Sequence, residues 1–315
     1  MHETKPIILY DTDMDTDCDD VGALAMLCEY VLAGRAELLG VVADAAAEDA
    51  APCCEAICRH YGLTPPVGAV YASDYPSARL EKYFAIRKTL PAHRYYNRPL
   101  AARVGKCATD YPRAVTLYRE LLAGAEDGSV TVVTVGFVTA LADLLSSPPD
   151  SISPLDGREL AARKLRCVVS MANVAYPTLT APNFNYDSEP LGTHAFLQSC
   201  PVPVFISPEG TKIVTGAHLT DACPADHPLR LAYEVYMEGE RRGRSSWDLV
   251  ALLFALEPNS PVFSVTPHPG EMLSYDADAC RLSWQSGTRA DAEVHTTVSA
   301  DGMTALLNDR MLGRF

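Results

Sequence analysis

The sequence lacks any unbroken apolar run of about 18 residues, the length that a membrane-spanning helix requires. Its start, MHETKPIILYDTD, also lacks the basic region, apolar stretch and small-residue cleavage site of an export signal. We therefore expect a cytoplasmic protein with no membrane partner. A trimmed export signal would leave the same start.

Positive charge is also scarce. The chain of 315 residues has 26 Lys and Arg against 40 Asp and Glu, which gives a net charge of −14. Such a protein repels phosphate backbones and anionic lipid surfaces. The composition therefore excludes nucleic-acid binding through a basic face.

The cysteines lack the spacing of a metal or redox motif. None of the ten forms a CxxC pair, and Cys54 and Cys58 do not have zinc-site spacing. Most of them lie in apolar runs. We expect reduced, buried thiols, as in a cytoplasmic protein.

No internal repeat, low-complexity tract or flexible linker interrupts the chain, so we expect one domain over residues 1–315. Short β-branched runs alternate with helical periodicity. The strand and helix pairs are 6–10 with 21–34, 37–42 with 51–61, 130–135 with 139–145 and 165–171 with 190–197, and a strand at 202–206 follows. This alternation predicts an α/β fold, a Rossmann-like, open and mostly parallel sheet with helices on both faces.

Two segments depart from this alternation. Residues 72–105 are rich in Tyr, Pro and Arg with little periodicity, and we interpret them as an excursion and a candidate lid. Residues 264–315 contain alternating patterns such as RLSW and EVHTTV. These patterns predict a few short antiparallel strands added to the main sheet near the C-terminus.

Six carboxylates lie between the first predicted strand and its helix, in the run DTDMDTDCDD. They are Asp11, Asp13, Asp15, Asp17, Asp19 and Asp20. Open α/β sheets bind ligands at the carboxyl ends of their strands. Six charges there repel one another unless a cation matches them, and oxygen ligands suit Ca²⁺ or Mg²⁺. The alternative is a solvated turn whose last two acids stabilise the helix N-terminus. We favour a metal site, since a solvated turn rarely needs six acids.

Two other acidic signatures match this spacing poorly. The EF-hand pattern fails, because the registers that begin at Asp13 and Asp15 lack its glycine and its final glutamate. In a haloacid-dehalogenase-type phosphatase the strand ends in DxDx[TV], and that fifth position falls here on another aspartate. A Mg²⁺-dependent phosphatase therefore remains a weaker alternative.

The opening DTDMDTDCDDVGAL resembles the motif DTDMGxDxDDxxAL of one branch of the inosine/uridine-preferring nucleoside hydrolases, which are calcium-dependent ribonucleoside hydrolases. Later segments resemble the same family in order and spacing. They are TVVTVGFVTALADLL (131–145), CVVSMANV (167–174), NFNYDSEP (183–190), FISPEG (205–210) and SSWDLVALLFAL (245–256). The resemblance covers roughly residues 5 to 290.

The resemblance implies a Ca²⁺ ion that binds the attacking water and the ribose 2′- and 3′-hydroxyls. Its ligands would be the carboxylates of Asp13, Asp20 and Asp248 and the backbone carbonyl of Val135. Asp13 would also be the general base. This role is physically reasonable, because a carboxylate beside a dication has a low pKa and the metal makes the water more acidic. The alternative interpretation of Asp248 is that its side chain only caps the N-terminus of a helix.

The resemblance also implies sugar-binding residues. Asp19 would hold the ribose 2′-hydroxyl, Met171 and Asn185 would contact the sugar, and Asn183 stands where the family usually has a glutamate. By default Met171 would be a core residue and the two asparagines turn residues. Two amides in an acidic cleft nevertheless suit sugar hydroxyls.

The sequence departs from the family pattern at several positions. Asp15 occupies the place of a glycine, and Asp44 is the nearest polar substitute for a ribose-binding asparagine. Trp247 stands where purine-cleaving members have a histidine that protonates the base. Of the eight histidines, we expect only His93 to lie near a base. Leaving-group activation must therefore differ from that of purine-cleaving members, or be weak.

The leading hypothesis is an N-glycosyl hydrolase that cleaves a ribonucleoside or related riboside with Ca²⁺-activated water and releases base and ribose. One alternative is a Ca²⁺-dependent riboside-binding protein with little or no turnover, and the other is the Mg²⁺-dependent phosphatase. The expected partner is a small-molecule nucleoside or riboside. The family resemblance further implies a homodimer or homotetramer. The sequence does not identify the base.

Overall fold

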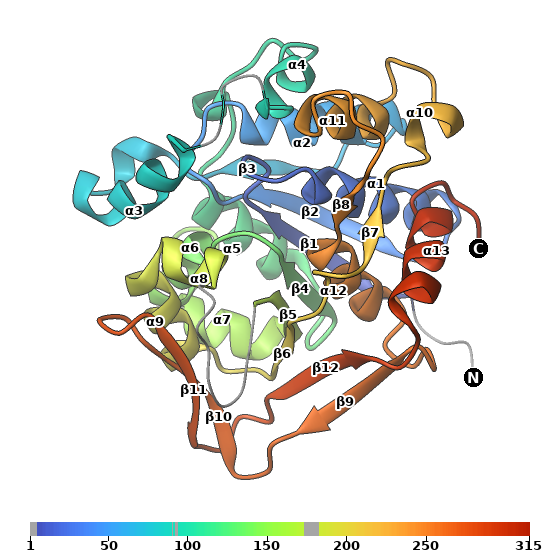
Figure 1. The fold of residues 1–315 in the computed structure, drawn as a ribbon. Helices are drawn as coiled ribbons and strands as arrows, with labels where there is room; N and C mark the ends of the chain where they lie inside the picture. The colour runs from blue at the N-terminus through green and yellow to red at the C-terminus, as the bar shows by residue number, and fades with distance from the viewer. Residues whose placement is uncertain (1–4, 90, 92–93, 173–182) are drawn as a thin grey trace.

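The centre of the fold is an eight-stranded sheet, seen in a computed structural model that describes residues 5–89, 91, 94–172 and 183–315 (Figure 1). From one edge to the other its strands are β3 (Val67–Ala69), β2 (Glu37–Ala43), β1 (Ile7–Thr12), β4 (Val130–Thr134), β5 (Leu165–Met171), β6 (Val204–Ser207), β12 (Ala292–Thr296) and β9 (Phe263–Pro267). Neighbouring strands are parallel from β3 to β12, and β9 runs antiparallel to β12. The predicted mostly parallel sheet is confirmed.

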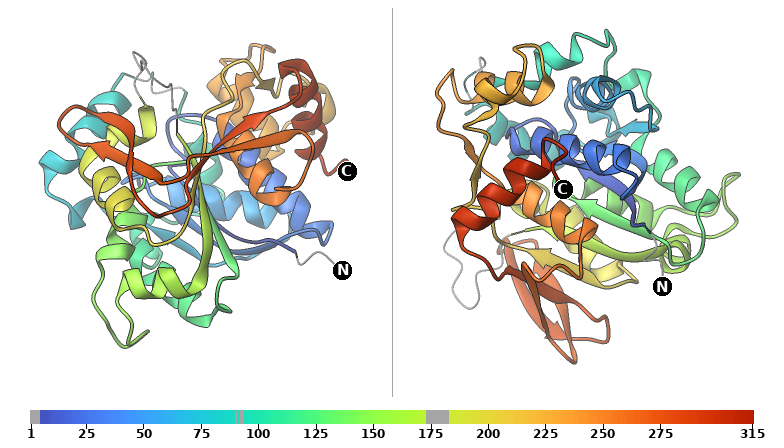
Figure 2. Two further views of the ribbon diagram at one scale, coloured as in Figure 1. Left: turned by 90° about the horizontal axis from the view of Figure 1, so that it is seen from below. Right: turned by 90° about the vertical axis from the view of Figure 1, so that its right-hand side faces the viewer.

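Helices cover both faces of this sheet (Figure 2). They are α1 (Asp19–Leu32), α2 (Ala50–His60), α3 (Ser77–Arg87), α4 (Asn97–Ala101), α5 (Ala114–Gly124), α6 (Thr139–Ser146), α7 (Gly157–Lys164), α8 (Phe184–Ser188), α9 (Pro190–Ser199), α10 (Leu219–Ala222), α11 (Pro228–Tyr236), α12 (Trp247–Leu256) and α13 (Ala300–Arg310). Alternate residues of a strand point to opposite faces. Ile8 and Tyr10 therefore join one buried cluster with α1, α2 and α12, whereas Leu9 joins another with α5, α6 and α9. Among the described residues, none of the helices has the length and apolar character needed to cross a bilayer.

Two regions differ from the sequence-based expectation. The segment 72–105, whose sequence has little periodicity, contains the 3-10 turn η1 (Ala72–Asp74) and the helices α3 and α4. Near the C-terminus β9 joins the main sheet antiparallel to β12, as predicted, but β10 (Glu271–Asp276) and β11 (Arg281–Ser286) form a separate antiparallel hairpin. A second two-stranded ladder joins β7 (Val214–Thr215) to β8 (Arg244–Ser245).

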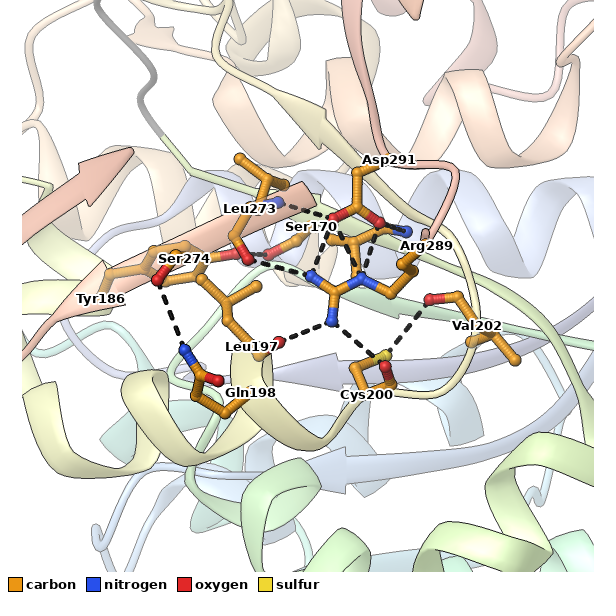
Figure 3. A network of polar contacts seen from close by, with 11 residues as sticks. Ser170, Tyr186, Leu197, Gln198, Cys200, Val202, Leu273, Ser274, Arg289 and Asp291 are labelled. Atoms are coloured by element: carbon orange, nitrogen blue, oxygen red, sulfur yellow. Dashed lines mark hydrogen bonds and ion pairs between the residues drawn. The ribbon is translucent and has the colours of Figure 1, made fainter. Parts of the chain in front are cut away.

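A buried ion pair anchors the C-terminal hairpin (Figure 3). The side chain of Arg289 is 6% exposed and binds Asp291, with 2.7 Å between Nη2 and Oδ2. Its Nη1 donates to the carbonyls of Leu197 and Cys200 at the end of α9, and its Nη2 donates to that of Leu273 in β10. A cation that satisfies the last carbonyls of a helix stabilises that helix end. The pair therefore links the hairpin to α9.

Candidate functional site

The carboxyl ends of β1, β4 and β5 border a cavity of about 370 Å³. Its place is where open α/β sheets bind ligands, and its size lies within the range of about 300–1,000 Å³ for small-molecule sites. Nine of the ten predicted site residues line it. They are Asp13, Asp19, Asp20, Val135, Met171, Asn183, Asn185, Trp247 and Asp248. The structure thus brings together side chains from five separate sequence segments.

A tight turn after β1 gathers the carboxylates. Met14 is fully buried and has a φ of 43°, in the left-handed region that non-glycine residues rarely adopt. The hydroxyl of Thr12 and the backbone nitrogen of Met14 both donate to Oδ1 of Asp20. Gly136, just after β4, lets a second segment pass close by, because a Cβ there would lie 2.2 Å from the backbone nitrogen of Asp13. The two strand ends therefore meet without a side chain between them.

Three carboxylates form a candidate metal centre. Asp19 and Asp20 begin α1, and Asp248 is the second residue of α12, which packs against α1. One oxygen from each of the three lies within 4.8 Å of the other two, and all three residues are buried. Burial, followed by the charges of the neighbouring aspartates, raises the pKa of Asp20 and Asp248 well above the usual value, and burial with Asp17 does so for Asp19. Such a group must be protonated or hold a cation, and its oxygen donors suit Ca²⁺ or Mg²⁺.

Asp13 lies beside this cluster. Its pKa is raised to about 7, mainly by burial and then by the charge of Asp15, while a hydrogen bond with Asp20 partly offsets the rise. The hydroxyl of Thr16 donates to its Oδ2 at 3.2 Å. A cation bound next to Asp13 would lower this pKa. The carboxylate could then accept a proton at neutral pH.

Polar groups from β4, β5 and α8 line the rest of this side of the cavity. The Asn185 side-chain amide donates to the carbonyl of Val135, with 2.6 Å between nitrogen and oxygen. A carbonyl oxygen has a second lone pair, so Val135 retains an acceptor site. Asn183 caps α8 through a bond from the Tyr186 amide and also lines the cavity, whereas Met171 ends β5. The turn and the binding interpretations of Asn183 are therefore compatible.

Asp44 does not line the described cavity wall. It follows β2, is buried, and accepts a hydrogen bond from the backbone nitrogen of Phe137 at 3.2 Å. Burial and the adjacent Asp11 raise its pKa. Its Oδ2 has no partner within the described part of the chain. The structure thus places Asp44 beneath the strand ends, next to Gly136.

The chain resembles known proteins in its structure but not in its sequence. No protein-family model matches the chain, and no curated protein matches it by sequence. Among solved structures, the inosine-uridine preferring nucleoside hydrolase from Bacillus anthracis superposes with a TM-score of 0.65 at 15% identity, covering 98% of this chain and 99% of its own. A plant nucleoside hydrolase, PpNRh1, gives 0.66 at 14% identity over 98% of this chain and 99% of its own. The type III effector protein XopQ, solved in complex with adenosine diphosphate ribose, gives 0.70 at 15% identity over 99% of this chain and 94% of its own.

The chain has the nucleoside hydrolase fold. At this level of identity the likeness establishes the architecture, and activity must be argued from the site.

Sequence reasoning did not find another group of cavity-lining residues, which includes Thr211, Tyr236 and Arg244. Arg244 lies in β8, and its Cζ is 5.1 Å from the ring centroid of Trp247 and 5.5 Å from that of Tyr236. The indole nitrogen of Trp247 donates to the hydroxyl of Thr211 at 3.1 Å. The available signal was the nearness of Arg244 to Asp248 in the sequence. His93 lies outside the described residues.

The aspartate at the usual glycine position has a clear structural role. Asp15 is buried, and its carboxylate binds Arg87 of α3, with 2.7 Å between Nε and Oδ2. The hydroxyl of Tyr83 donates to it at 2.6 Å, and the side-chain amide of Asn97 in α4 donates at 2.9 Å. Through these contacts the carboxylate of Asp15 links the segment 72–105 to the acidic turn.

Proposed function

We propose that this chain is a calcium-dependent N-glycosyl hydrolase, which cleaves the N-glycosidic bond of a ribonucleoside or related riboside and releases base and ribose. The observation that carries the proposal is the buried cluster of Asp19, Asp20 and Asp248 in a cavity at the carboxyl edge of a nucleoside hydrolase fold. Two structural neighbours are nucleoside hydrolases, which supports this reaction class.

The residues of the cavity fit a divalent cation. Asp13, Asp20 and Asp248 would hold it together with the carbonyl of Val135, and all four are buried oxygen donors. The three carboxylates form no ion pair within the described chain, so their charge is uncompensated. A bound Ca²⁺ supplies positive charge that lowers the pKa of a water molecule and attracts vicinal sugar hydroxyls.

The chain's own residues orient the sugar and move a proton. Asp19 accepts a hydrogen bond from a ribose hydroxyl, and Asn183, Asn185 and Met171 contact the sugar. Asp13 takes the proton of the water that adds to C1′. Positive charge develops on the ribosyl ring as the bond to the base breaks. The carboxylates around the ring stabilise this charge.

A second candidate is a Ca²⁺-dependent riboside-binding protein with little turnover. The effector XopQ, solved with adenosine diphosphate ribose, has a TM-score of 0.70 with this chain. Trp247 replaces the histidine that purine-cleaving hydrolases use, and Asp44 does not line the described cavity. These departures would leave a sugar site while removing part of the catalytic machinery.

The test measures turnover and binding on the same preparations. Wild type, Asp13→Asn and Asp278→Asn are supplied with Ca²⁺ and a panel of ribosides: inosine, uridine, adenosine, cytidine and nicotinamide riboside. Asp278 lies exposed in the β10–β11 turn, so its variant is the matched control. Release of reducing sugar is measured, and ribose binding is measured by calorimetry.

We expect sugar release by wild type and by the control. The Asp13→Asn variant should lose at least about 100-fold in rate, since general bases contribute about 10²–10⁴-fold. Calcium-dependent ribose binding without sugar release from any riboside would refute the hydrolase and support the riboside-binding protein. Release of phosphate from phosphomonoesters, with no ribose binding, would overturn both and favour the Mg²⁺-dependent phosphatase.

A further inference from the structure

One cation lines the acidic cavity. Of the charged residues that border its described wall, five are aspartates and the sixth is Arg244. Trp247 and Tyr236 lie next to the guanidinium and line the same cavity. This group of one planar cation and two aromatic rings differs chemically from the carboxylates on the other side of the cavity, which suit hydroxyls and a metal ion. The cavity therefore has a second side that suits a flat, aromatic part of a ligand.

Asp17 fixes the orientation of this guanidinium. Nε of Arg244 donates to both carboxylate oxygens at 2.9 Å, and Nη2 donates to Oδ2. Burial lowers the pKa of Arg244, but the hydrogen bonds and charge of Asp17 raise it by more. Nη1 makes no hydrogen bond within the part of the chain that the structure describes. Its donors remain available for a ligand while the rest of the group is held in place.

The ion pair is attached directly to the carboxylate cluster. Asp17 precedes Asp19 by two residues, and Arg244 precedes Asp248 by four. The pair therefore bridges the same two segments, the β1–α1 turn and the β8–α12 connection, that supply the three clustered carboxylates. A sugar held by these carboxylates would have its C1′ substituent in the same cavity as Arg244.

We propose that Arg244 binds the leaving group of the riboside, with Nη1 donating to a ring carbonyl oxygen of a base that stacks on Trp247. This inference rests on the proposed function and adds a base-binding residue that the family resemblance did not supply. The same residue accounts for leaving-group activation in a chain that has Trp247 where purine-cleaving hydrolases have a histidine.

The chemistry requires no proton from Arg244. When the bond between C1′ and the base nitrogen breaks, its electron pair stays on the nitrogen and delocalises onto the ring carbonyl oxygen. Water adds to C1′ and gives its proton to Asp13, and the departing base anion later takes a proton from solvent. Arginine keeps its protons in proteins, so it acts by stabilising the negative charge on that oxygen.

The test compares Arg244→Gln with Arg242→Gln. Arg242 is a matched control, because it is an exposed arginine of the same loop that pairs with Glu240. Calorimetry measures the binding of hypoxanthine, uracil and ribose to the calcium-loaded protein. Steady-state assays measure kcat on inosine, uridine and nicotinamide riboside. Nicotinamide leaves as a neutral molecule, so its departure develops no anion for Arg244 to stabilise.

We expect Arg244→Gln to weaken hypoxanthine and uracil binding at least about tenfold, as for the loss of a charged hydrogen bond, while ribose binding reports an intact fold. The kcat on inosine and uridine should fall about 100-fold more than the kcat on nicotinamide riboside, in line with the loss of one oxyanion donor. Equal base affinity in the two arginine variants would overturn the assignment of Arg244. Absence of sugar release by wild type would instead refute the proposed hydrolase, because base binding is measured without turnover.

Discussion

The acidic turn at residues 13–20 contains two kinds of aspartate whose surroundings differ. Asp15 and Asp17, here called the paired aspartates, each form an ion pair with an arginine, Arg87 and Arg244 respectively. The unpaired aspartates form no ion pair within the described chain. They are Asp13, Asp19 and Asp20, together with Asp248 from α12.

This difference separates a structural role from a chemical one. An arginine neutralises each paired aspartate and fastens a distant segment to the turn. The unpaired aspartates repel one another, and burial, the largest effect, raises the pKa of each. They therefore need protons or a cation. Compensation by arginine thus distinguishes aspartates that hold the site together from those that remain available for a metal ion or a sugar.

The largest expected effect follows from removing an unpaired charge. Asp248→Asn should weaken Ca²⁺ binding by more than about 100-fold, because even changes outside the ligand shell cost about 10–100-fold. Asp15→Asn, the matched change among the paired aspartates, should lose much less calcium affinity, because Arg87 already compensates the charge of Asp15. Calcium titration calorimetry measures both. Similar losses in the two variants would contradict the distinction between the two kinds of aspartate.

Metal removal should make stability depend on pH. The folded pKa of Asp13 is about 7 against an ordinary value of 3.8, and those of Asp19, Asp20 and Asp248 are also raised. Between these values the native state binds more protons than the unfolded state, so metal-free stability must fall as pH rises. In EDTA we expect a lower Tm at about pH 7.5 than at about pH 5.

Calcium should reverse this loss. It replaces the protons on the unpaired aspartates, so its stabilising effect should be larger at the higher pH, where those protons no longer compete. Differential scanning calorimetry with and without Ca²⁺ at both pH values measures the effect. A metal-free Tm that rises with pH over this interval would refute the assignment of raised pKa values to this cluster.

The sequence allowed the main sheet to be predicted, because its strands are apolar runs that alternate with helical periodicity. It did not reveal α3, since the buried side of that helix includes Arg87 beside Leu80 and Tyr83, and an arginine breaks the apolar pattern. The strand β3 is only three residues long. Both elements depend on tertiary contacts that local periodicity does not encode.

The same limit applied to the site. The density of aspartates predicted a metal-binding turn, and the family resemblance named six further residues that line the cavity. They are Val135, Met171, Asn183, Asn185, Trp247 and Asp248. The sequence could not separate paired from unpaired aspartates, because Arg87 and Arg244 lie 72 and 227 residues away from their partners. It also placed Asp44 at the sugar, whereas its side chain accepts from the backbone of Phe137 under the strand ends. Such pairings form only when the tertiary fold brings distant segments of the chain together.

The smallest effect is expected from breaking the ion pair of a paired aspartate, and it concerns the stability of the fold. Asp15→Asn keeps the shape of the side chain, so Tyr83 can still donate to it, but Arg87 loses its counter-charge. Breaking a buried pair costs about 3–5 kcal/mol. Arg87 remains 22% exposed to water, so we expect a loss of about 1–3 kcal/mol in the free energy of unfolding.

Urea denaturation of Asp15→Asn, Arg87→Gln and the double variant measures this coupling. If the ion pair is the stabilising contact, the double variant should be destabilised by clearly less than the sum of the single changes. Additive losses would mean that Asp15 acts through Tyr83 and Asn97 alone. In either case the segment 72–105 should become more susceptible to proteolysis than in Asp278→Asn, because the carboxylate of Asp15 binds both α3 and α4.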